Sequence, residues 1–104
     1  MMNVSGFDWD DGNCNKCLKH GVSIAEIEAM FSGEPFVSPD IGHSGQETRF
    51  IAIGKTANGR YLFVTFVFRS VVGAHRIRPI SARYMHQKEI DRFDQAIAAP
   101  NKRR

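Results

Sequence analysis

The apolar residues in the first third of the chain recur at helical spacing. "SIAE" places Ser23 three residues before Glu26, which is the capping box that begins many helices, and "SGEP" ends the segment. The apolar positions on one face of this predicted helix are Ile27, Met30 and Phe31. An earlier helix is expected after a short strand in "FDWD", capped by Asp8 or Asp10 and ended at Gly21.

Beyond residue 35 the pattern changes to the alternation that is typical of strands. A short edge strand is expected at Phe36–Ser38. "ETRFIAIGKT" and "NGRYLFVTFVF" predict a β-hairpin, with a primed turn at Asn58 and Gly59. The second run is apolar on both faces, so we expect it to be the central strand. Its faces are Leu62, Val64, Phe66 and Phe68 on one side and Tyr61, Phe63 and Val67 on the other.

"HRIRPISAR" predicts one more strand. Its proline indicates an edge position or a bulge, because proline cannot donate to a ladder. Before any bulge, alternation places His75, Ile77, Pro79, Ser81 and Arg83 on one face and Arg76, Arg78, Ile80 and Ala82 on the other. A last helix is expected from Met85 or His86 through Ile97, followed by a basic tail at residues 99–104.

This order of elements predicts an α+β fold. A short strand and two helices come first, about four strands follow consecutively, and one helix ends the chain. Such an order favours an antiparallel-rich sheet with helices packed mostly on one face. With 104 residues, the chain is expected to form a single domain with its core at about residues 7–98.

Charge is divided unevenly along the chain, although the net charge is only +3. Residues 1–48 hold two basic and eight acidic side chains, whereas residues 49–104 hold twelve and three. This asymmetry favours an anionic partner such as a nucleic acid or an acidic protein, and a solvated surface is the plainer interpretation. The longest apolar run, "YLFVTFVF", is far shorter than the roughly 20 residues of a membrane helix, and no signal peptide is visible. We therefore expect a cytoplasmic protein that does not bind membranes.

The two cysteines are not expected to bind a metal. On a helix, Cys14 and His20 would lie about 9 Å apart along the axis and on different faces, and no second Cys/His pair completes a site. "CNKC" also lacks the βαβ unit that surrounds a thioredoxin-type redox motif. We expect reduced thiols, no metal and no cofactor.

The arginines of the last predicted strand are the first candidates for chemistry. Guanidinium groups offer planar forks of donors that match phosphate oxygens, and they stay charged at physiological pH. Arg83 also lies near the start of the last helix, where free N–H groups favour an anion. It could equally form an ion pair with Glu47 or Glu89.

Two further groups could carry acid–base chemistry. Lys19 and His20 end the first predicted helix, where cations interact favourably with the helix dipole. An imidazole can also act as a general acid or base near neutral pH. Glu47 and Arg49 lie two residues apart in an expected strand and therefore on one face, an arrangement that is more often structural than catalytic.

Taken in order, "FDWD", "LKHGVS", "GQETRFIAIG", "GRYLFVTFVFR" and "RIRPISARYMHQKE" resemble the BrnT-like toxins of bacterial type II toxin–antitoxin systems. The resemblance covers roughly residues 7–94. It implies a RelE-like fold and an endoribonuclease that blocks translation by cutting RNA without a metal or cofactor. It also implies a BrnA-like antitoxin, whose ribbon-helix-helix domain brings the complex to operator DNA. A homodimer or a toxin–antitoxin heterotetramer is the expected assembly.

The resemblance also implies roles for individual residues. The implied catalytic residues are Lys19, His20, Glu47, Arg49 and Arg83. The implied phosphate-binding residues are Arg76, Arg78 and Ser81. Either His20 or Glu47 would be the base, and Arg49 and Arg83 would contact the phosphate. These roles require that the guanidiniums of the late strands converge, free of carboxylate partners, on a pocket for one sugar–phosphate link.

Two other classes of function remain open. A binding module would recognise RNA or an antitoxin through the basic sheet without cutting anything. A scaffold would pair its arginines with Glu26, Glu28 and Glu34 of a neighbouring subunit.

Overall fold

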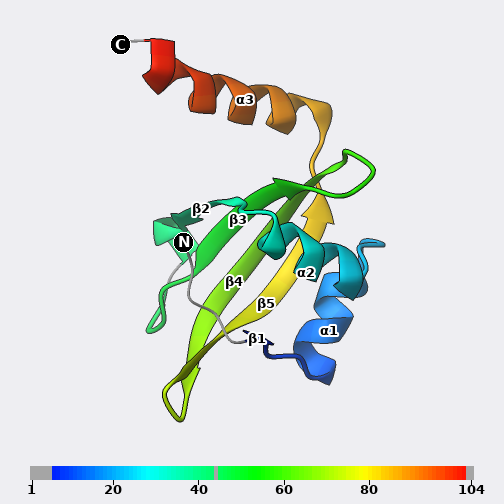
Figure 1. Ribbon diagram of the computed structural model, residues 1–104, viewed down its shortest axis with the longest axis vertical. Coiled ribbons are helices and arrows are strands. Elements are labelled where there is room, and N and C mark those ends of the chain that lie inside the picture. Colours follow the sequence, from blue (N-terminus) through cyan, green and yellow to red (C-terminus); the bar gives the residue numbers. More distant parts are fainter. Residues whose placement is uncertain (1–5, 44, 103–104) are drawn as a thin grey trace.

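The computed structural model describes residues 6–43 and 45–102 and shows an α+β fold (Figure 1). The strands are β1 (Gly6–Phe7), β2 (Phe36–Pro39), β3 (Phe50–Lys55), β4 (Tyr61–Val71) and β5 (Ala74–Tyr84). The helices are α1 (Asp11–Leu18), α2 (Ile24–Ser32) and α3 (Gln87–Lys102), with a short 3-10 helix η1 (Ile41–His43). The sheet has the order β1–β5–β4–β3–β2, and its neighbours are antiparallel except for β1 and β5. The predicted fold class and the central position of β4 are confirmed.

Both N-terminal helices begin at expected capping residues. The Asp10 carboxylate accepts a hydrogen bond from the backbone N–H of Asn13 at 3.2 Å, and the Asn13 side-chain oxygen accepts one from the backbone N–H of Asp10 at 2.8 Å. Ser23 and Glu26 form the same reciprocal pair at the start of α2. A side-chain cap of this kind stabilises a helix by about 1 kcal/mol. α2 ends at Gly33, as predicted.

α1 and α2 cover one face of the sheet, and the hydrophobic core lies between the two layers (Figure 1). The side chains of β4 that are fully buried in this core are Leu62, Val64 and Phe66. They pack in one cluster with Ile27 and Met30 of α2. Gly54 on β3 allows α2 to come close, because a Cβ at this position would lie 2.6 Å from Cγ of Met30.

A β-bulge at the proline of β5 interrupts the pairing with β4. Thr65 pairs with Ser81, but the next residue of β4, Phe66, pairs with Pro79, so that Ile80 has no counterpart on β4. The predicted irregularity at the proline is therefore confirmed. Because the bulge skips one residue, side chains on either side of it no longer follow simple alternation.

This shift corrects the predicted faces of β5. Paired residues share a face, and Tyr84 pairs with the buried Leu62 whereas Arg83 pairs with Phe63 on the other side. The polar side chains that the bulge gathers on the face opposite the core are Arg76, Arg78, Ser81 and Arg83. The prediction that Ser81 and Arg83 lie on the opposite face from the other two arginines is wrong.

Of the two hairpin turns, the one between β3 and β4 differs from expectation. The turn between β4 and β5 consists of Val72 and Gly73, whose φ angles of 49° and 78° are those of a primed turn. Between β3 and β4, Gly59 has a φ of 83°, but Asn58 does not adopt a positive φ. The predicted primed turn at Asn58-Gly59 is therefore wrong, because the N–H of Gly59 instead donates to the carbonyl of Thr56 at 2.9 Å.

α3 lies across one end of the sheet (Figure 1). Its Phe93 ring centroid lies 5.5 Å from that of Phe36 and 6.2 Å from that of Tyr61. The Tyr61 hydroxyl donates a hydrogen bond to Asp94 at 3.1 Å. The helix continues through Pro100, so residues 99–102 of the expected tail are helical, and residues 103–104 lie outside the described part of the chain.

Candidate functional site

The face of the sheet opposite α1 and α2 is the candidate functional surface and is called the open face below. Figure 1 shows both helices on one side of the sheet. According to the strand register, the centre of the open face comprises Ile51, Ile53, Phe63, Thr65, Val67 and Ser81. The arginines of the open face are Arg69, Arg76, Arg78 and Arg83. Guanidiniums beside an apolar and hydroxyl-bearing centre are groups that can hold the phosphates of a nucleic acid.

Arg83 is held firmly at the end of β5. Its two terminal nitrogens donate to the two carboxylate oxygens of Glu89 at 2.7 Å each. The guanidinium also lies 4.4 Å from the centroid of the Phe63 ring, which is a cation–π distance. The Arg83 guanidinium and the backbone N–H of His86 lower the pKa of Glu89 to about 2. The carboxylate is thus committed to Arg83 and to the start of α3.

Arg78 joins β5 to the segment before α1. Its guanidinium lies 3.0 Å from a carboxylate oxygen of Asp10 and 3.5 Å from one of Asp8. The hydrogen bond from Arg78 holds the pKa of Asp10 below its usual value. Because Asp10 also caps α1, this arginine helps to fix the start of that helix on the sheet.

Glu47 lies at the other end of the open face, in the loop before β3. Its carboxylate forms an ion pair with Arg69 of β4, and Arg69 is directly opposite Arg76 of β5. Side-chain exposures of 37% for Arg69 and 49% for Glu47 leave both groups accessible to a ligand. Because β3 begins only at Phe50, the prediction that Glu47 and Arg49 belong to a strand is wrong.

Lys19 and His20 lie in the exposed turn between α1 and α2. The chain reverses at Gly21, which has a φ of 85°. In the described part of the chain, no hydrogen bond or ion pair joins His20 to Glu47 or to Arg83. Within the described residues, the predicted pair of Lys19 and His20 therefore has no hydrogen bond or ion pair to Glu47 or Arg83.

The predicted convergence of the late arginines on one pocket is wrong. Arg76 and Arg83 are seven residues apart in β5, which corresponds to roughly 23 Å along a strand. Three of the four arginines of the open face are also held by carboxylates of the chain itself. Ser81 lies between the two ends, paired with Thr65. The candidate residues form separate groups along the face, with Glu47 and Arg69 at one end and Arg83 at the other.

Two contacts at the ends of the sheet were not expected from the sequence. Arg69, the partner of Glu47, could have been found from the two-residue turn that places it opposite Arg76, but valine in the first turn position weakens that signal. Near the other end, the guanidinium carbon of Arg60 lies 3.4 Å from the centroid of the Tyr84 ring. The Tyr84 hydroxyl donates to Glu26 at 2.7 Å, which ties the start of α2 to the end of β5.

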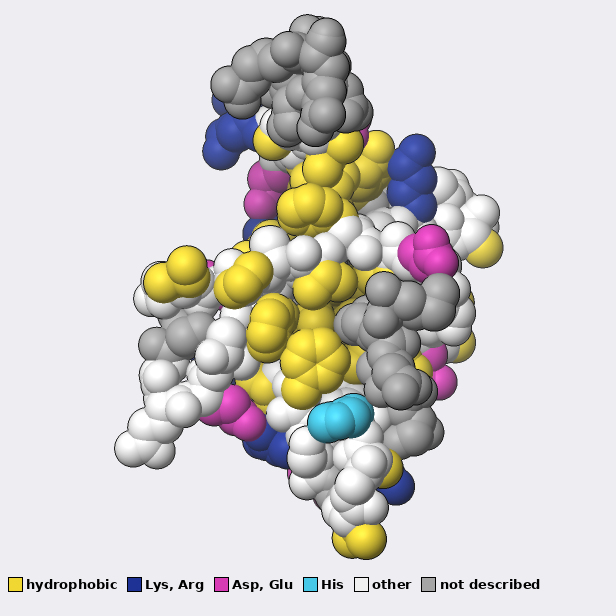
Figure 2. All heavy atoms as spheres, turned by 60° about the vertical axis from the view of Figure 1, so that its left-hand side comes forward, with side chains coloured by type: hydrophobic (Ala, Val, Ile, Leu, Met, Phe, Trp, Pro, Cys, Tyr) yellow, Lys and Arg dark blue, Asp and Glu magenta, His cyan; other side chains and the backbone are white. Residues whose placement is uncertain are grey.

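A cleft of about 650 Å³ lies between α3 and the neighbouring end of the sheet. Figure 2 shows hydrophobic side chains gathered where α3 faces the sheet. The apolar residues that line the cleft include Met30, Phe36, Ile53, Phe93 and Ile97. Glu34, Lys55 and Asp94 are the charged residues that line it. The cleft therefore offers apolar contact, and none of the predicted catalytic residues lines it.

Metal-ligating and thiol groups are not clustered in the described part of the chain. No group of three His, Cys, Asp or Glu side chains among residues 6–43 and 45–102 is placed to hold a metal ion. Cys14 and Cys17 are free thiols. Burial raises the pKa of the Cys17 thiol to about 11, which makes this sulfur a poor nucleophile.

Comparison with known proteins identifies the family. The family model described as "Ribonuclease toxin, BrnT, of type II toxin-antitoxin system" matches residues 9–89. This segment contains the four arginines of the open face and the carboxylates that pair with them, except that of Asp8. No curated protein matches the chain. Within the described residues, no helix combines the length and the apolar content that are needed to cross a bilayer. On the strength of the family match, this chain belongs to the BrnT family of type II toxin–antitoxin ribonuclease toxins.

Proposed function

We propose that the chain is a metal-independent endoribonuclease toxin that inhibits translation by cutting RNA in the cytoplasm. The family match supports ribonuclease chemistry and a toxin–antitoxin context. The open face supports RNA as the ligand, because its arginines offer donor forks that match phosphate oxygens. A BrnA-like antitoxin neutralises the toxin and carries the complex to operator DNA. A short reading frame for a DNA-binding protein directly downstream of the toxin gene is the genomic observation that tests this partner.

The Glu47–Arg69 pair is the observation that carries the catalytic assignment. It places a carboxylate that can accept a proton beside a guanidinium that can hold a phosphate, and both side chains remain accessible. The other such pair on the open face, Arg83 and Glu89, is less suited to proton transfer. Glu89 accepts three hydrogen bonds and has a pKa of about 2, which makes it a weak base.

In the proposed reaction the ribose 2′-hydroxyl is the nucleophile. Glu47 accepts the proton of this hydroxyl as its oxygen bonds to the adjacent phosphorus. The bond from phosphorus to the 5′-oxygen breaks, water protonates that oxygen, and a 2′,3′-cyclic phosphate remains. Arg69 donates hydrogen bonds to the phosphate oxygens on which negative charge develops, and Arg49 follows Glu47 by two residues in the same loop.

The proposal is tested with purified protein and end-labelled RNA in excess EDTA. The wild-type chain should cut RNA and leave cyclic phosphate ends, and Glu47→Gln and Arg69→Ala should each slow cleavage by about 10²- to 10³-fold. Asp91→Asn and Arg92→Ala on the exposed surface of α3 make the same two changes of net charge and should leave the rate unchanged. RNA that stays intact with the wild-type chain contradicts metal-independent cleavage. Full activity of Glu47→Gln contradicts the choice of base.

A binding module that does not cut RNA is the second candidate. The ion pairs of the open face favour it, because three of its four arginines already have a carboxylate partner. This function predicts that intact RNA migrates more slowly on a gel in the presence of the protein, with no cleavage products after long incubation.

A further inference from the structure

The hairpin of β4 and β5 extends beyond the rest of the sheet. β3 pairs with β4 only as far as Phe66, and β1 pairs with β5 only at Arg76 and Ile77. Residues 67–78 therefore form the outer part of the hairpin, called the ribbon below, which has β1 beside it only at Arg76 and Ile77 and ends at the turn of Val72 and Gly73. Figure 1 shows the ribbon projecting from the end of the sheet opposite α3.

Two arginines face each other across the ribbon. Arg69 and Arg76 are paired in the register, so their side chains share the open face at directly opposed positions. Like charges in such positions destabilise a β-ladder. Glu47 neutralises Arg69, but no carboxylate of the described residues pairs with Arg76, whose side chain is exposed. The ribbon therefore carries an exposed cation that has no carboxylate partner within the described chain.

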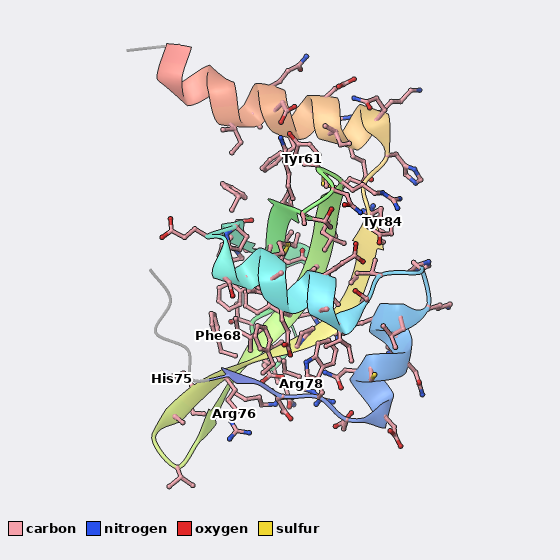
Figure 3. All side chains as sticks on the ribbon, turned by 45° about the vertical axis from the view of Figure 1, so that its right-hand side comes forward. Tyr61, Phe68, His75, Arg76, Arg78 and Tyr84 are labelled. Carbon is pink, nitrogen blue, oxygen red and sulfur yellow. The ribbon has the colours of Figure 1, made fainter. Side chains whose placement is uncertain are left out.

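The charged groups near the ribbon that the structure describes do not neutralise Arg76. Asp8 and Asp10 are engaged by Arg78, which Figure 3 shows beside β1 and the start of α1, whereas Arg76 lies nearer the hairpin turn. His75 belongs to the opposite face, where its Nδ1 lies 3.2 Å from the hydroxyl of Ser70. An anion that approaches the open face of the ribbon therefore meets Arg76 with Arg69 beside it.

The turn of the ribbon supplies an independent observation. Val72 adopts a φ of 49° and is a fully exposed residue, at 101% of the reference area. A β-branched residue is strained in this left-handed conformation, for which glycine or asparagine is the usual choice. Full exposure means that no contact within the described chain compensates for the strain. Strain that persists at an exposed tip is typical of segments that contact a partner.

We propose that the ribbon is an arm that binds the phosphodiester backbone of RNA beside the cleavage site. Arg76 holds a phosphate that flanks the cleaved linkage, with Arg69 as the neighbouring cation, and Val72 contacts the strand beyond it. Arg76 is thus a positioning residue, because it orients the strand relative to Glu47 and takes no part in bond breaking. Such contacts fix the register of a nucleic acid without reading its sequence. This inference rests on the proposed ribonuclease function and adds a second binding element to it.

The test measures RNA binding by matched variants. The probe is a 2′-O-methyl RNA oligonucleotide, which has no free 2′-hydroxyl and cannot be cut by the proposed reaction. Arg76→Ala should weaken its binding by about fivefold and reduce the slope of log Kd against log salt concentration by about 0.7, the value for one phosphate contact with a single strand. Arg76→Glu should weaken binding further.

The matched control is Arg92→Ala on α3, an exposed arginine at the other end of the sheet. Weaker binding and a smaller salt slope in Arg76→Ala, with neither change in Arg92→Ala, support the arm. Equal weakening in both variants would show that net charge alone attracts RNA, and would overturn the proposal. Unchanged RNA binding by Arg76→Ala would also overturn it, including the case in which this variant instead loses affinity for the antitoxin.

Cleavage of natural RNA separates this inference from the ribonuclease proposal. Arg76→Ala should raise KM by about fivefold with kcat within about twofold of wild type, as expected for a residue that binds substrate and transition state equally. Glu47→Gln should instead lower kcat. If the wild-type chain binds the 2′-O-methyl RNA through Arg76 and cuts no natural RNA, the arm stands and the ribonuclease proposal fails.

Discussion

A single carboxylate, that of Glu89, joins the end of β5 to the start of α3. It accepts a hydrogen bond at 2.7 Å from each of two terminal nitrogens of Arg83 and another at 3.0 Å from the backbone N–H of His86. The same three donors explain why the pKa of Glu89 falls from its usual 4.5 to about 2. At the residue scale, the Glu89 side chain therefore links β5 to α3, and this link depends on the protonation state of its carboxylate.

The lowered pKa makes part of the stability depend on pH. Because Glu89 binds its proton less tightly in the folded chain than in the unfolded one, its ionised form stabilises the fold above about pH 4.5, and this contribution is lost as the pH falls towards 2. Urea unfolding should show that Glu89→Gln is less stable than wild type at pH 7 and that the two converge near pH 2. Asp91→Asn, a neighbour on the same helix, should show no such convergence. A difference that stays constant with pH would rule out the ion pair as its cause.

Breaking the Arg83–Glu89 pair from either side separates two roles of Arg83. Arg83→Ala and Glu89→Ala both remove the ion pair, but only the first removes the guanidinium. If Arg83 contacts the phosphate, Arg83→Ala should lose growth arrest through a roughly hundredfold lower cleavage rate, whereas Glu89→Ala should keep it. The measurement is growth of cells that express each variant alone, normalised to the amount of soluble protein. Equal loss in both variants would assign Arg83 to holding α3.

At the element scale, Asn13 attaches α1 to β5. This buried side chain donates through its nitrogen to the carbonyl of Asp8 at 2.9 Å and to that of Pro79 at 2.8 Å, while its oxygen caps the backbone of Asp10. Because proline cannot donate to a neighbouring strand, β5 has an interrupted edge here, and the helix uses the carbonyl that remains. The bulge and the docking of α1 thus occur at the same point of β5.

Replacement of Asn13 should show how much this attachment of α1 to β5 contributes to stability. Asn13→Ala leaves the buried carbonyl of Pro79 without its donor and should lower the free energy of unfolding by about 1–3 kcal/mol. Asn15→Ala, at an exposed position of the same helix, should change it by less than about 0.5 kcal/mol. Urea titration of both variants provides the measurement. Similar small effects would show that water replaces the lost hydrogen bonds.

The elements could be predicted from the sequence because their signals are local. The capping box at Ser23 and the alternation in β4 depend on residues a few positions apart. Which candidate residues lie close together could not be predicted in this way. It depends on the bulge at Ile80 and on pairs such as Arg69–Glu47 and Arg78–Asp10, whose members are 22 and 68 positions apart in the sequence. The sequence alone therefore placed Arg76, Arg78, Ser81 and Arg83 on a late strand of the sheet but did not identify the residues that contact them.

At the scale of the whole molecule, the acidic and basic halves of the chain partly neutralise each other. Asp10 pairs with Arg78 and Glu47 with Arg69, so carboxylates from the first 48 residues occupy guanidiniums of the late strands. Part of the charge asymmetry that favoured an external anion is therefore satisfied by folding. The family match, together with the exposed Arg76, supports RNA more strongly than the net charge does.

The parallel pairing of β1 with β5 has a consequence for protein synthesis. β1 is made early, but its partners are Arg76 and Ile77, and α1 binds the carbonyl of Pro79. Until these residues have left the ribosome, the nascent chain lacks the strand against which α1 packs. Such long-range contacts form late. The surface proposed to bind RNA thus forms only when most of the polypeptide has already been translated.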